Sequence, residues 1–224
     1  MEPIAVLTSG GLDSCVMLAD LARTRIAHPI YVQAGLAWEA EERKVLEAYI
    51  AALRDVNVRP LTTLSVPVAP MYGRHWSITG EGVPGADAPD RAVFLPGRNI
   101  LLIGLAAVWC STHDTHEIAI GSLEANPFPD ASPEFFDLFG RALTMGLGHD
   151  VRVVAPYRGL FKSELIRRNA GLPLELSLTC ANPRNGVHCG DCNKCAERHG
   201  AFIDAGVTDK TRYAKPLEGG RRHG

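Results

Sequence analysis

The chain alternates between short, continuous apolar runs and longer segments that repeat apolar residues at helical spacing. The short runs predict buried strands over residues 4–7, 30–33, 61–66, 117–121 and 151–155. The longer segments predict helices over residues 16–23, 39–53, 99–110, 134–147 and 162–170. Because strands alternate with helices, we expect an α/β fold in which helices cover both faces of a parallel, twisted sheet.

Three stretches depart from this alternation. Residues 69–95 are rich in Gly, Pro and Asp and predict a long loop, and loops of that length are often functional lids. Cysteines cluster after the last predicted helix, and Gly, Arg and His dominate the end of the chain. We therefore expect a main domain over residues 1–175, a small cysteine module over 176–214 and a flexible tail over 215–224.

Composition and charge narrow the class of protein. The 224 residues are 46% hydrophobic and 21% charged, which is typical of a globular chain and fits one domain with a small appendage. The net charge of −2 argues against non-specific nucleic-acid binding over the whole surface. No apolar run is long enough to cross a bilayer, and the N-terminus lacks the pattern of a signal peptide. We therefore expect a cytoplasmic protein with reduced thiols.

A glycine-rich loop follows the first predicted strand. Glycines let the backbone approach a ligand closely, and the next helix directs free N–H groups and its positive dipole end at an anion. Asp13 is better suited to hold Mg²⁺ than to bind phosphate directly. A plain strand–turn–helix connection is the alternative. The candidate nucleotide-binding residues are Thr8, Ser9, Gly10, Gly11, Leu12, Asp13 and Ser14.

The string Ser9-Gly-Gly-Leu-Asp-Ser14 resembles the signature of the PP-loop, or N-type, ATP pyrophosphatases. The resemblance implies a Rossmann-like, adenine-nucleotide α-hydrolase-like fold and an enzyme that uses ATP with Mg²⁺. Enzymes of this kind activate a carbonyl oxygen by adenylation and release pyrophosphate. The string is not a Walker loop, because no Gly-Lys-Ser/Thr follows it.

Four cysteines near the C-terminus have the spacing of metal ligands, with eight, two and two residues between them. They are Cys180, Cys189, Cys192 and Cys195. Four thiolates in a closed tetrahedral site are typical of structural Zn²⁺. An iron–sulfur cluster is the rival interpretation, since it can also use four cysteines. His188 is a neighbour that four cysteines make unnecessary as a ligand, so we expect it to support the site or lie on the surface.

The cysteine string His188-Cys-Gly-Asp-Cys-Asn-Lys-Cys-Ala-Glu-Arg198, together with the phosphate loop, is similar to the 7-cyano-7-deazaguanine synthases. The resemblance spans about residues 4 to 203. It implies an ATP-dependent C–N ligase that converts 7-carboxy-7-deazaguanine and ammonia to the nitrile precursor of queuosine, through an adenylated carboxylate and an amide. It also implies a homodimer. No amidotransferase domain is evident, so free ammonia is the expected nitrogen donor.

The resemblance also nominates residues for the reaction. We expect Asp13, Arg98 and Lys162 to be catalytic, with Arg98 and Lys162 facing phosphate or carboxylate. For both cations the alternative is an ordinary charge on a helix surface. The predicted substrate-binding residues are Arg98, Asn99, Glu124 and Asp130. Glu164 is better explained by pairing with Arg167 or Arg168 on its own helix.

The sequence departs from this family where substrate contacts are expected. Leu36-Ala37-Trp38 replaces the usual Gln-Arg/Lys-His, and residues 124–132 lack the family's tyrosine, cysteine and arginine. Trp38 and Phe128 are candidates for stacking on a base or for core packing. Two alternatives therefore stay open: PP-loop chemistry on another acceptor (a tRNA base, a protein amine or another small carboxylate), or a zinc-ribbon binding module with a nucleotide-sensing domain.

Overall fold

The structure is a computed structural model that describes residues 1–54 and 56–217. Within these residues, five parallel strands form one sheet in the order β3-β2-β1-β4-β5. The strands are β1 (Pro3–Leu7), β2 (Ile26–Gln33), β3 (Thr62–Ser65), β4 (Glu117–Ala119) and β5 (Arg152–Val154). The strand order reverses between β1 and β4, so the carboxyl ends of these two strands flank the point where open α/β sheets bind ligands.

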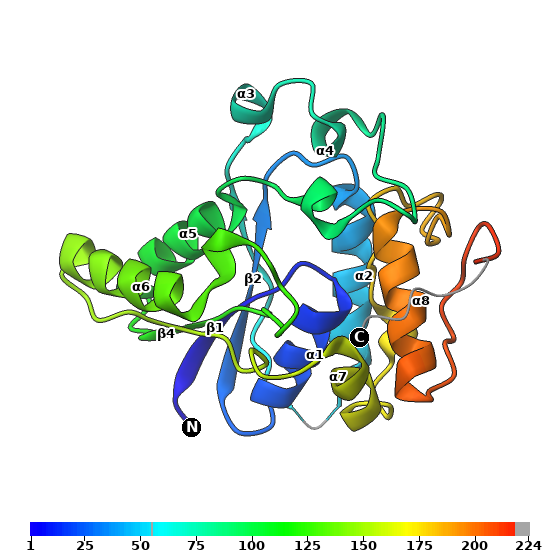
Figure 1. The fold of residues 1–224 in the computed structure, drawn as a ribbon. Helices are drawn as coiled ribbons and strands as arrows, with labels where there is room; N and C mark the ends of the chain where they lie inside the picture. Colours follow the sequence, from blue (N-terminus) through cyan, green and yellow to red (C-terminus); the bar gives the residue numbers. More distant parts are fainter. Residues whose placement is uncertain (55, 218–224) are drawn as a thin grey trace.

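Helices cover both faces of this sheet, as predicted (Figure 1). Helices α5 (Arg98–Thr112) and α6 (Pro133–Leu147) lie on one face. The other face carries α1, α2, α7 and α8, which span Leu12–Leu21, Glu39–Ala52, Lys162–Arg168 and Asn193–Ala205. Short helical turns complete the described fold at α3 (Ala69–Tyr72), α4 (Trp76–Thr79), η1 (Asp90–Val93), η2 (Pro129–Ala131) and η3 (Leu174–Leu176).

Strand β1 is apolar because it is buried on both faces of the sheet. Ile4 and Val6 belong to the hydrophobic core beneath α1 and α7, whereas Ala5 and Leu7 belong to the core beneath α5 and α6. Successive side chains of a strand point to opposite faces, so a strand covered on both sides has no polar positions. This burial fixes the end of β1 and, with it, the start of the phosphate loop.

Several predicted boundaries were wrong. Strand β2 begins at Ile26, four residues before the predicted position 30. The prediction began too late because prolines are rare inside strands, but Pro29 lies within β2, opposite Val6. The loop predicted over 69–95 contains α3, α4 and η1. Helix α8, which follows the first three cysteines, was not predicted. Most of the tail expected over 215–224 lies outside the described residues.

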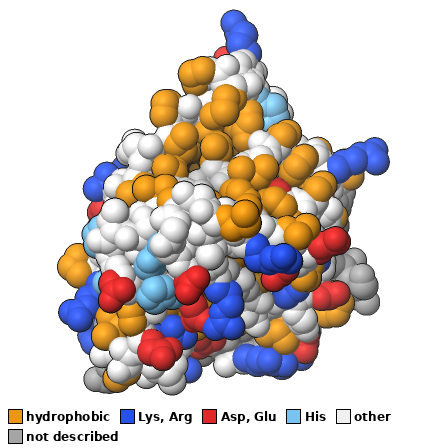
Figure 2. Space-filling view, turned by 90° about the vertical axis from the view of Figure 1, so that its left-hand side faces the viewer, with side chains coloured by type: hydrophobic (Ala, Val, Ile, Leu, Met, Phe, Trp, Pro, Cys, Tyr) orange, Lys and Arg blue, Asp and Glu red, His pale blue; other side chains and the backbone are white. Residues whose placement is uncertain are grey.

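Hydrophobic side chains are exposed on the side of the molecule that carries α5 and α6. Figure 2 faces the α5 and α6 side and shows hydrophobic side chains gathered over the upper part of the molecule. Large exposed hydrophobic residues include Val108 on α5 and Leu138 and Met145 on α6. Among the described helices, none combines the length and apolar character needed to span a membrane.

Candidate functional site

The phosphate loop connects β1 to α1 at the switch point of the sheet. Gly10 has a φ of +74°, and a Cβ atom there would lie 2.8 Å from the backbone oxygen of Glu42. Only glycine combines that backbone conformation with so close a contact to α2. Gly11 precedes α1 without a side-chain cap. The loop therefore packs tightly against α2 and leaves the positive end of α1 available to an anion.

The hydroxyl groups of the loop are partly committed to its shape. The backbone N–H of Ser9 donates to Ser14 Oγ over 3.1 Å, and Ser14 Oγ donates to the carbonyl of Gly11 over 3.0 Å. Thr8 Oγ1 donates to the carbonyl of Ile30 in β2. These bonds fix the loop before any ligand arrives, which lowers the entropic cost of binding one.

A cavity of about 300 Å³ opens above this loop. The predicted site residues Thr8, Ser9, Gly11, Leu12, Asp13, Ser14, Arg98, Asn99, Asp130 and Lys162 all line it. Gly10 supports the loop from behind, against α2. Glu124 is exposed and is not among the residues lining this cavity, although its backbone N–H bonds to Leu160 in the neighbouring connection. The structure thus brings together every predicted site residue of the α/β domain except Glu124.

Lys162, at the start of α7, lies in a network of charged groups beside the loop. Its Nζ is 3.4 Å from Asp13 Oδ2 and contacts Glu197 Oε1. Burial alone would lower the pKa of Lys162, but the carboxylates of Asp13 and Glu197 more than offset it and raise the pKa above its ordinary value. Lys162 is therefore a cation held at the cavity. It is not an ordinary solvated charge on a helix surface, which was the alternative interpretation of this residue.

Two buried oxygen atoms beside the loop lack partners. Asp13 Oδ1 and Ser122 Oγ have no hydrogen-bond partner among the described residues, although both residues line the cavity. Gly121, which precedes Ser122, packs against the backbone of Asp13. Buried polar atoms are normally paired, so these oxygens mark a place where a ligand or a cation fits.

Asn99 and Asp130 hold each other at the opposite side of the cavity. The backbone N–H of Asn99 donates to Asp130 Oδ2, and Asn99 Nδ2 donates to the carbonyl of Asp130, both over 3.0 Å. Asp130 thereby satisfies an unpaired N–H at the start of α5. Arg98 lines the cavity at the first position of this helix. The pairing fixes where Arg98 enters the cavity.

Aromatic side chains border the same space. Trp38 stacks on Trp76 with ring centroids 5.6 Å apart, and Phe128 stacks on Phe94 at 4.8 Å. All four residues line the cavity. Trp38 and Phe128 therefore pack on other aromatic rings and also border the cavity. Core packing and stacking on a bound base, the two roles predicted from the sequence, are compatible with each other.

Glu42 of α2 was missed by the sequence analysis. Its carboxylate lines the cavity and accepts hydrogen bonds from Tyr31 Oη and Trp38 Nε1. Burial, reinforced by the nearby Glu39, raises the pKa of Glu42 to about 7, against the opposing influence of Arg98. Glu42 lies in a charged stretch that suggested a solvated helix face. Only its place on the same side as Leu46 and Tyr49 hinted at burial.

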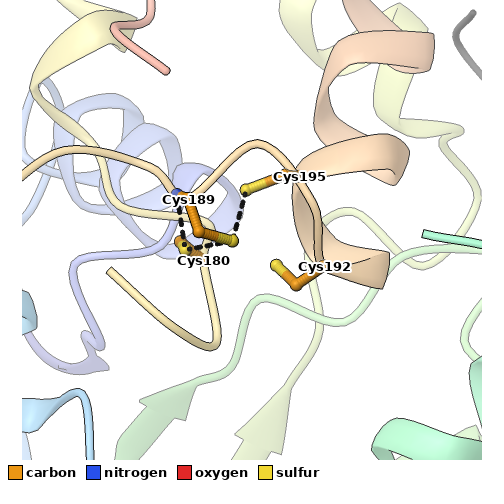
Figure 3. A group of neighbouring side chains, drawn as sticks. All are labelled: Cys180, Cys189, Cys192 and Cys195. Atoms are coloured by element: carbon orange, nitrogen blue, oxygen red, sulfur yellow. Dashed lines mark hydrogen bonds between the residues drawn. The ribbon is translucent and has the colours of Figure 1, made fainter. Parts of the chain in front are cut away.

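The four predicted cysteines converge on one point (Figure 3). Their sulfurs all lie within 4.8 Å of one another, with Cys189 Sγ 3.5 Å from Cys180 Sγ and 3.8 Å from Cys195 Sγ. A tetrahedral Zn²⁺ with bonds of about 2.3 Å requires sulfurs about 3.8 Å apart. An iron–sulfur cluster needs a wider spread, because irons and sulfides lie between the cysteines. The geometry therefore fits a single metal ion.

The surroundings support this site. The backbone N–H groups of Asn182 and Cys189 donate to Cys180 Sγ, as expected for a thiolate ligand. His188 is buried, so of its two expected roles the structure supports the one beside the site and not a surface position. Burial, with help from Arg198, lowers the pKa of His188 to about 3, and its Nε2 accepts the N–H of Thr179. His188 thus fixes the backbone beside the sulfurs.

Backbone and side-chain bonds join this module to the phosphate loop. The N–H of Leu178 donates to the carbonyl of Gly10 over 2.7 Å, and the N–H of Leu12 donates to Thr179 Oγ1. Arg198 of α8 is fully buried and donates to the same Thr179 hydroxyl. The segment between η3 and Cys180 therefore forms a wall of the cavity.

Comparisons with known proteins agree with these features. Residues 4–206 match the family model described as Queuosine biosynthesis protein QueC. The 7-cyano-7-deazaguanine synthase of Methanothermobacter thermautotrophicus is 33% identical over 230 residues, covering 95% of this chain and 99% of that protein. The protein of the same name from Methanopyrus kandleri is 35% identical over 236 residues, with the same coverage of 95% and 99%.

A solved structure gives a weaker match. It is described as "The crystal structure of predicted subunit of tRNA methyltransferase" from Methanocaldococcus jannaschii. The TM-score is 0.49 and the sequence identity is 14%, over 76% of this chain and 75% of that one. At this level of similarity the match adds nothing to the functional argument, which depends on the family and on the cavity.

Proposed function

Because the chain belongs to the QueC family of queuosine biosynthesis proteins, we propose that it makes 7-cyano-7-deazaguanine from 7-carboxy-7-deazaguanine, ammonia and ATP. One observation carries the proposal beyond family membership. A preformed phosphate loop, the cations Arg98 and Lys162 among others, and two unpartnered buried oxygens border one cavity. That set suits an adenylation reaction, which must bind phosphates and stabilise a leaving pyrophosphate.

The reaction proceeds in two activations. The substrate carboxylate attacks the α-phosphorus of ATP, the bond to the β-phosphate breaks, and pyrophosphate leaves. Ammonia then attacks the acyl carbon, AMP departs, and a proton is released to give the amide. The amide oxygen then attacks the α-phosphorus of a second ATP and pyrophosphate leaves. Departure of AMP, which carries that oxygen away, with release of the two amide protons leaves the nitrile. Walls that exclude water protect the acyl adenylate from hydrolysis.

The loop and its neighbours divide the work on ATP. Backbone N–H groups at the start of α1 bind the phosphates, and Lys162 balances the charge that develops on pyrophosphate. Asp13 would hold Mg²⁺, because its Oδ1 lacks a protein partner and carboxylate oxygens are preferred ligands of this ion. Bound there, Mg²⁺ would neutralise phosphate charge.

The acceptor is assigned to the other side of the cavity. Arg98 is the proposed partner of the substrate carboxylate, and Asn99 and Asp130 hold Arg98 in place and offer polar groups to the heterocycle. Glu124 makes no direct contact with the acceptor in this arrangement, because its side chain is exposed and lies outside the cavity lining. The stacked pairs Trp38–Trp76 and Phe94–Phe128 supply flat apolar walls, which suit aromatic bases.

The remaining parts of the proposal concern assembly and location. Cys180, Cys189, Cys192 and Cys195 would hold a structural Zn²⁺, with no coordination position left for substrate. A homodimer is consistent with the exposed hydrophobic side chains of α5 and α6 (Figure 2). We also propose that residues 1–175 form a nucleotide-binding domain and residues 176–214 a zinc module. The proposed location is the cytoplasm, where thiols stay reduced.

A single assay tests the main proposal. The purified, metal-loaded protein is mixed with 7-carboxy-7-deazaguanine, ammonium and Mg-ATP, and nitrile and AMP are quantified by mass spectrometry. We expect both products, and neither without ATP. A parallel reaction replaces the deazaguanine acid with other small carboxylates, tRNA or a protein amine. AMP release only with one of those acceptors would overturn the assigned substrate, and no AMP with any acceptor would overturn the enzymatic function.

A further inference from the structure

Two lysines from different helices share one carboxylate beside the phosphate loop. Glu197 Oε1 contacts Lys162 Nζ of α7, and Glu197 Oε2 lies 2.7 Å from Lys194 Nζ of α8. Lys162 and Lys194 both line the cavity, together with Asp13 and Ser14. The cavity therefore has a second ammonium group next to Lys162, and it comes from the cysteine module.

Carboxyl groups of the protein partner both ammonium groups of this cluster. Lys162 is paired with Asp13 and Glu197, and Lys194 is paired with Glu197, while burial raises the pKa of Asp13 above its ordinary value. Two lysines held by carboxylates are a poor arrangement for stability alone, because partly buried ion pairs cost desolvation energy. They are a good arrangement for a ligand that carries several negative charges and can replace the carboxylates as the partner of both ammonium groups.

We propose that Lys194 is a second phosphate-binding cation, and that Glu197 is a positioning residue that holds Lys162 and Lys194 together until the phosphates of ATP replace it. The inference rests on the proposed function and names further residues of the same site. Pyrophosphate is the ligand that engages both lysines most strongly, since its charge is greatest after the α–β bond breaks. The two lysines therefore stabilise the leaving group.

The position of Lys194 gives the metal site a part in nucleotide binding. Lys194 lies between Cys192 and Cys195, in the first turn of α8. Residues 84–90 brace this turn, because Asn193 donates to the carbonyls of Pro84 and Ala88. A metal ion held by the two flanking sulfurs therefore fixes the backbone that carries Lys194.

Pyrophosphate binding tests the role of Lys194 without any turnover. Binding of Mg-pyrophosphate is measured by titration calorimetry for the wild type, Lys194→Gln and Lys194→Arg, with the metal content of each protein determined beforehand. We expect Lys194→Gln to bind at least tenfold more weakly and Lys194→Arg to stay within threefold of the wild type. Lys210→Ala is the matched control, an exposed lysine of the same module outside the cavity lining, and should bind like the wild type.

Glu197→Gln tests positioning by separating two kinetic constants. Loss of the competing carboxylate should leave KM for ATP unchanged or lower it, while kcat for AMP formation falls tenfold or more because the lysines are no longer held. A merely structural role would instead raise KM together with loss of metal.

The outcomes separate this inference from the function beneath it. If the wild type binds Mg-pyrophosphate and makes AMP while metal-loaded Lys194→Gln binds equally well, the role of Lys194 is overturned and the proposed function stands. Equal losses in metal-loaded Lys194→Arg and Lys194→Gln would also overturn it, since the charge would then be irrelevant. A wild type that binds neither Mg-ATP nor Mg-pyrophosphate would overturn both proposals.

Discussion

The phosphate loop and the cysteine module border the same cavity, but different forces hold them in shape. The loop follows a strand that is buried on both faces, and backbone contacts with α2 fix its glycine turn. Helix α8 packs into the main core through Phe202, but few apolar side chains surround the cysteines themselves. Of the six buried residues in their hydrophobic cluster, within the described structure, four are the clustered cysteines.

This difference indicates two sources of order in one site. Strand burial and hydrogen bonds preorganise the loop without any ligand, whereas four thiols packed together gain their main stabilisation from a metal ion. The hydrogen bonds of Leu178 and Thr179 to the loop transmit the order of one region to the other. Substitutions that damage only one region can therefore measure how strongly the two depend on each other.

The largest effect is expected from Cys189→Ala. It removes one of four thiolates from a site of a kind whose metal binding is worth about 10–16 kcal/mol. We expect metal content below a tenth of an equivalent by elemental analysis and a loss of AMP formation of at least a hundredfold. The control is Cys110→Ala, which removes a buried thiol of α5 outside the cysteine group and should keep its metal. A full metal equivalent in Cys189→Ala would contradict the assignment.

Gly10→Ala should damage the loop and spare the module. The new Cβ would lie 2.8 Å from the Glu42 carbonyl and would also force a left-handed backbone on alanine. The combined cost is about 3 kcal/mol, measured by chemical denaturation, with Mg-ATP binding weakened tenfold or more and metal content unchanged.

Gly148→Ala is the control that measures the cost of a left-handed backbone at alanine without a steric contact. Its φ is +61°, but no atom lies within 4 Å of the position that a Cβ would take. Its cost should be only about 1 kcal/mol, without any change in nucleotide binding. Equal effects of the two substitutions would show that the contact with α2 does not shape the loop.

The last prediction concerns the pH dependence of stability. The pKa of Glu42 rises from 4.5 to about 7 on folding, so the folded protein holds a proton that the unfolded chain releases. Stability from this group is complete below pH 4.5 and is lost as the pH rises through 7. The free energy of unfolding of the wild type, relative to Glu42→Gln, should fall by about 3 kcal/mol over that range. Denaturant titrations at several pH values check it, and parallel curves would refute it.

Local patterns predicted the framework and the two motifs of this protein. The strands and most helices follow from apolar runs and helical periodicity, and the cysteine spacing alone predicted a group that the structure brings within 4.8 Å. The start of α1 was missed by four residues, because its first turn is the phosphate loop itself and carries no amphipathic pattern. Helix α8 was missed because cysteines and charged residues mask its apolar face.

The residues that the sequence concealed depend on contacts between distant segments. Ser122 and Glu197 carry no local signal and Glu42 carries only its helical spacing to Leu46 and Tyr49, since a carboxylate on a helix normally faces water and an isolated serine is common in loops. Their proximity to the loop arises from packing of α2, β4 and α8 around β1. Glu124 is the opposite case: its side chain is exposed and outside the cavity lining, although Ser122 and Asn126 on either side of it line the cavity, so its predicted contact with substrate stays a prediction.

The bond between Leu12 and Thr179 joins residues 167 positions apart, and it has a consequence for biosynthesis. While the ribosome is still making the final quarter of the chain, the glycine turn exists without its opposite wall. Loop closure over such a distance comes late in folding. A nascent or prematurely terminated polypeptide that lacks this segment therefore has an incomplete cavity beside the glycine turn.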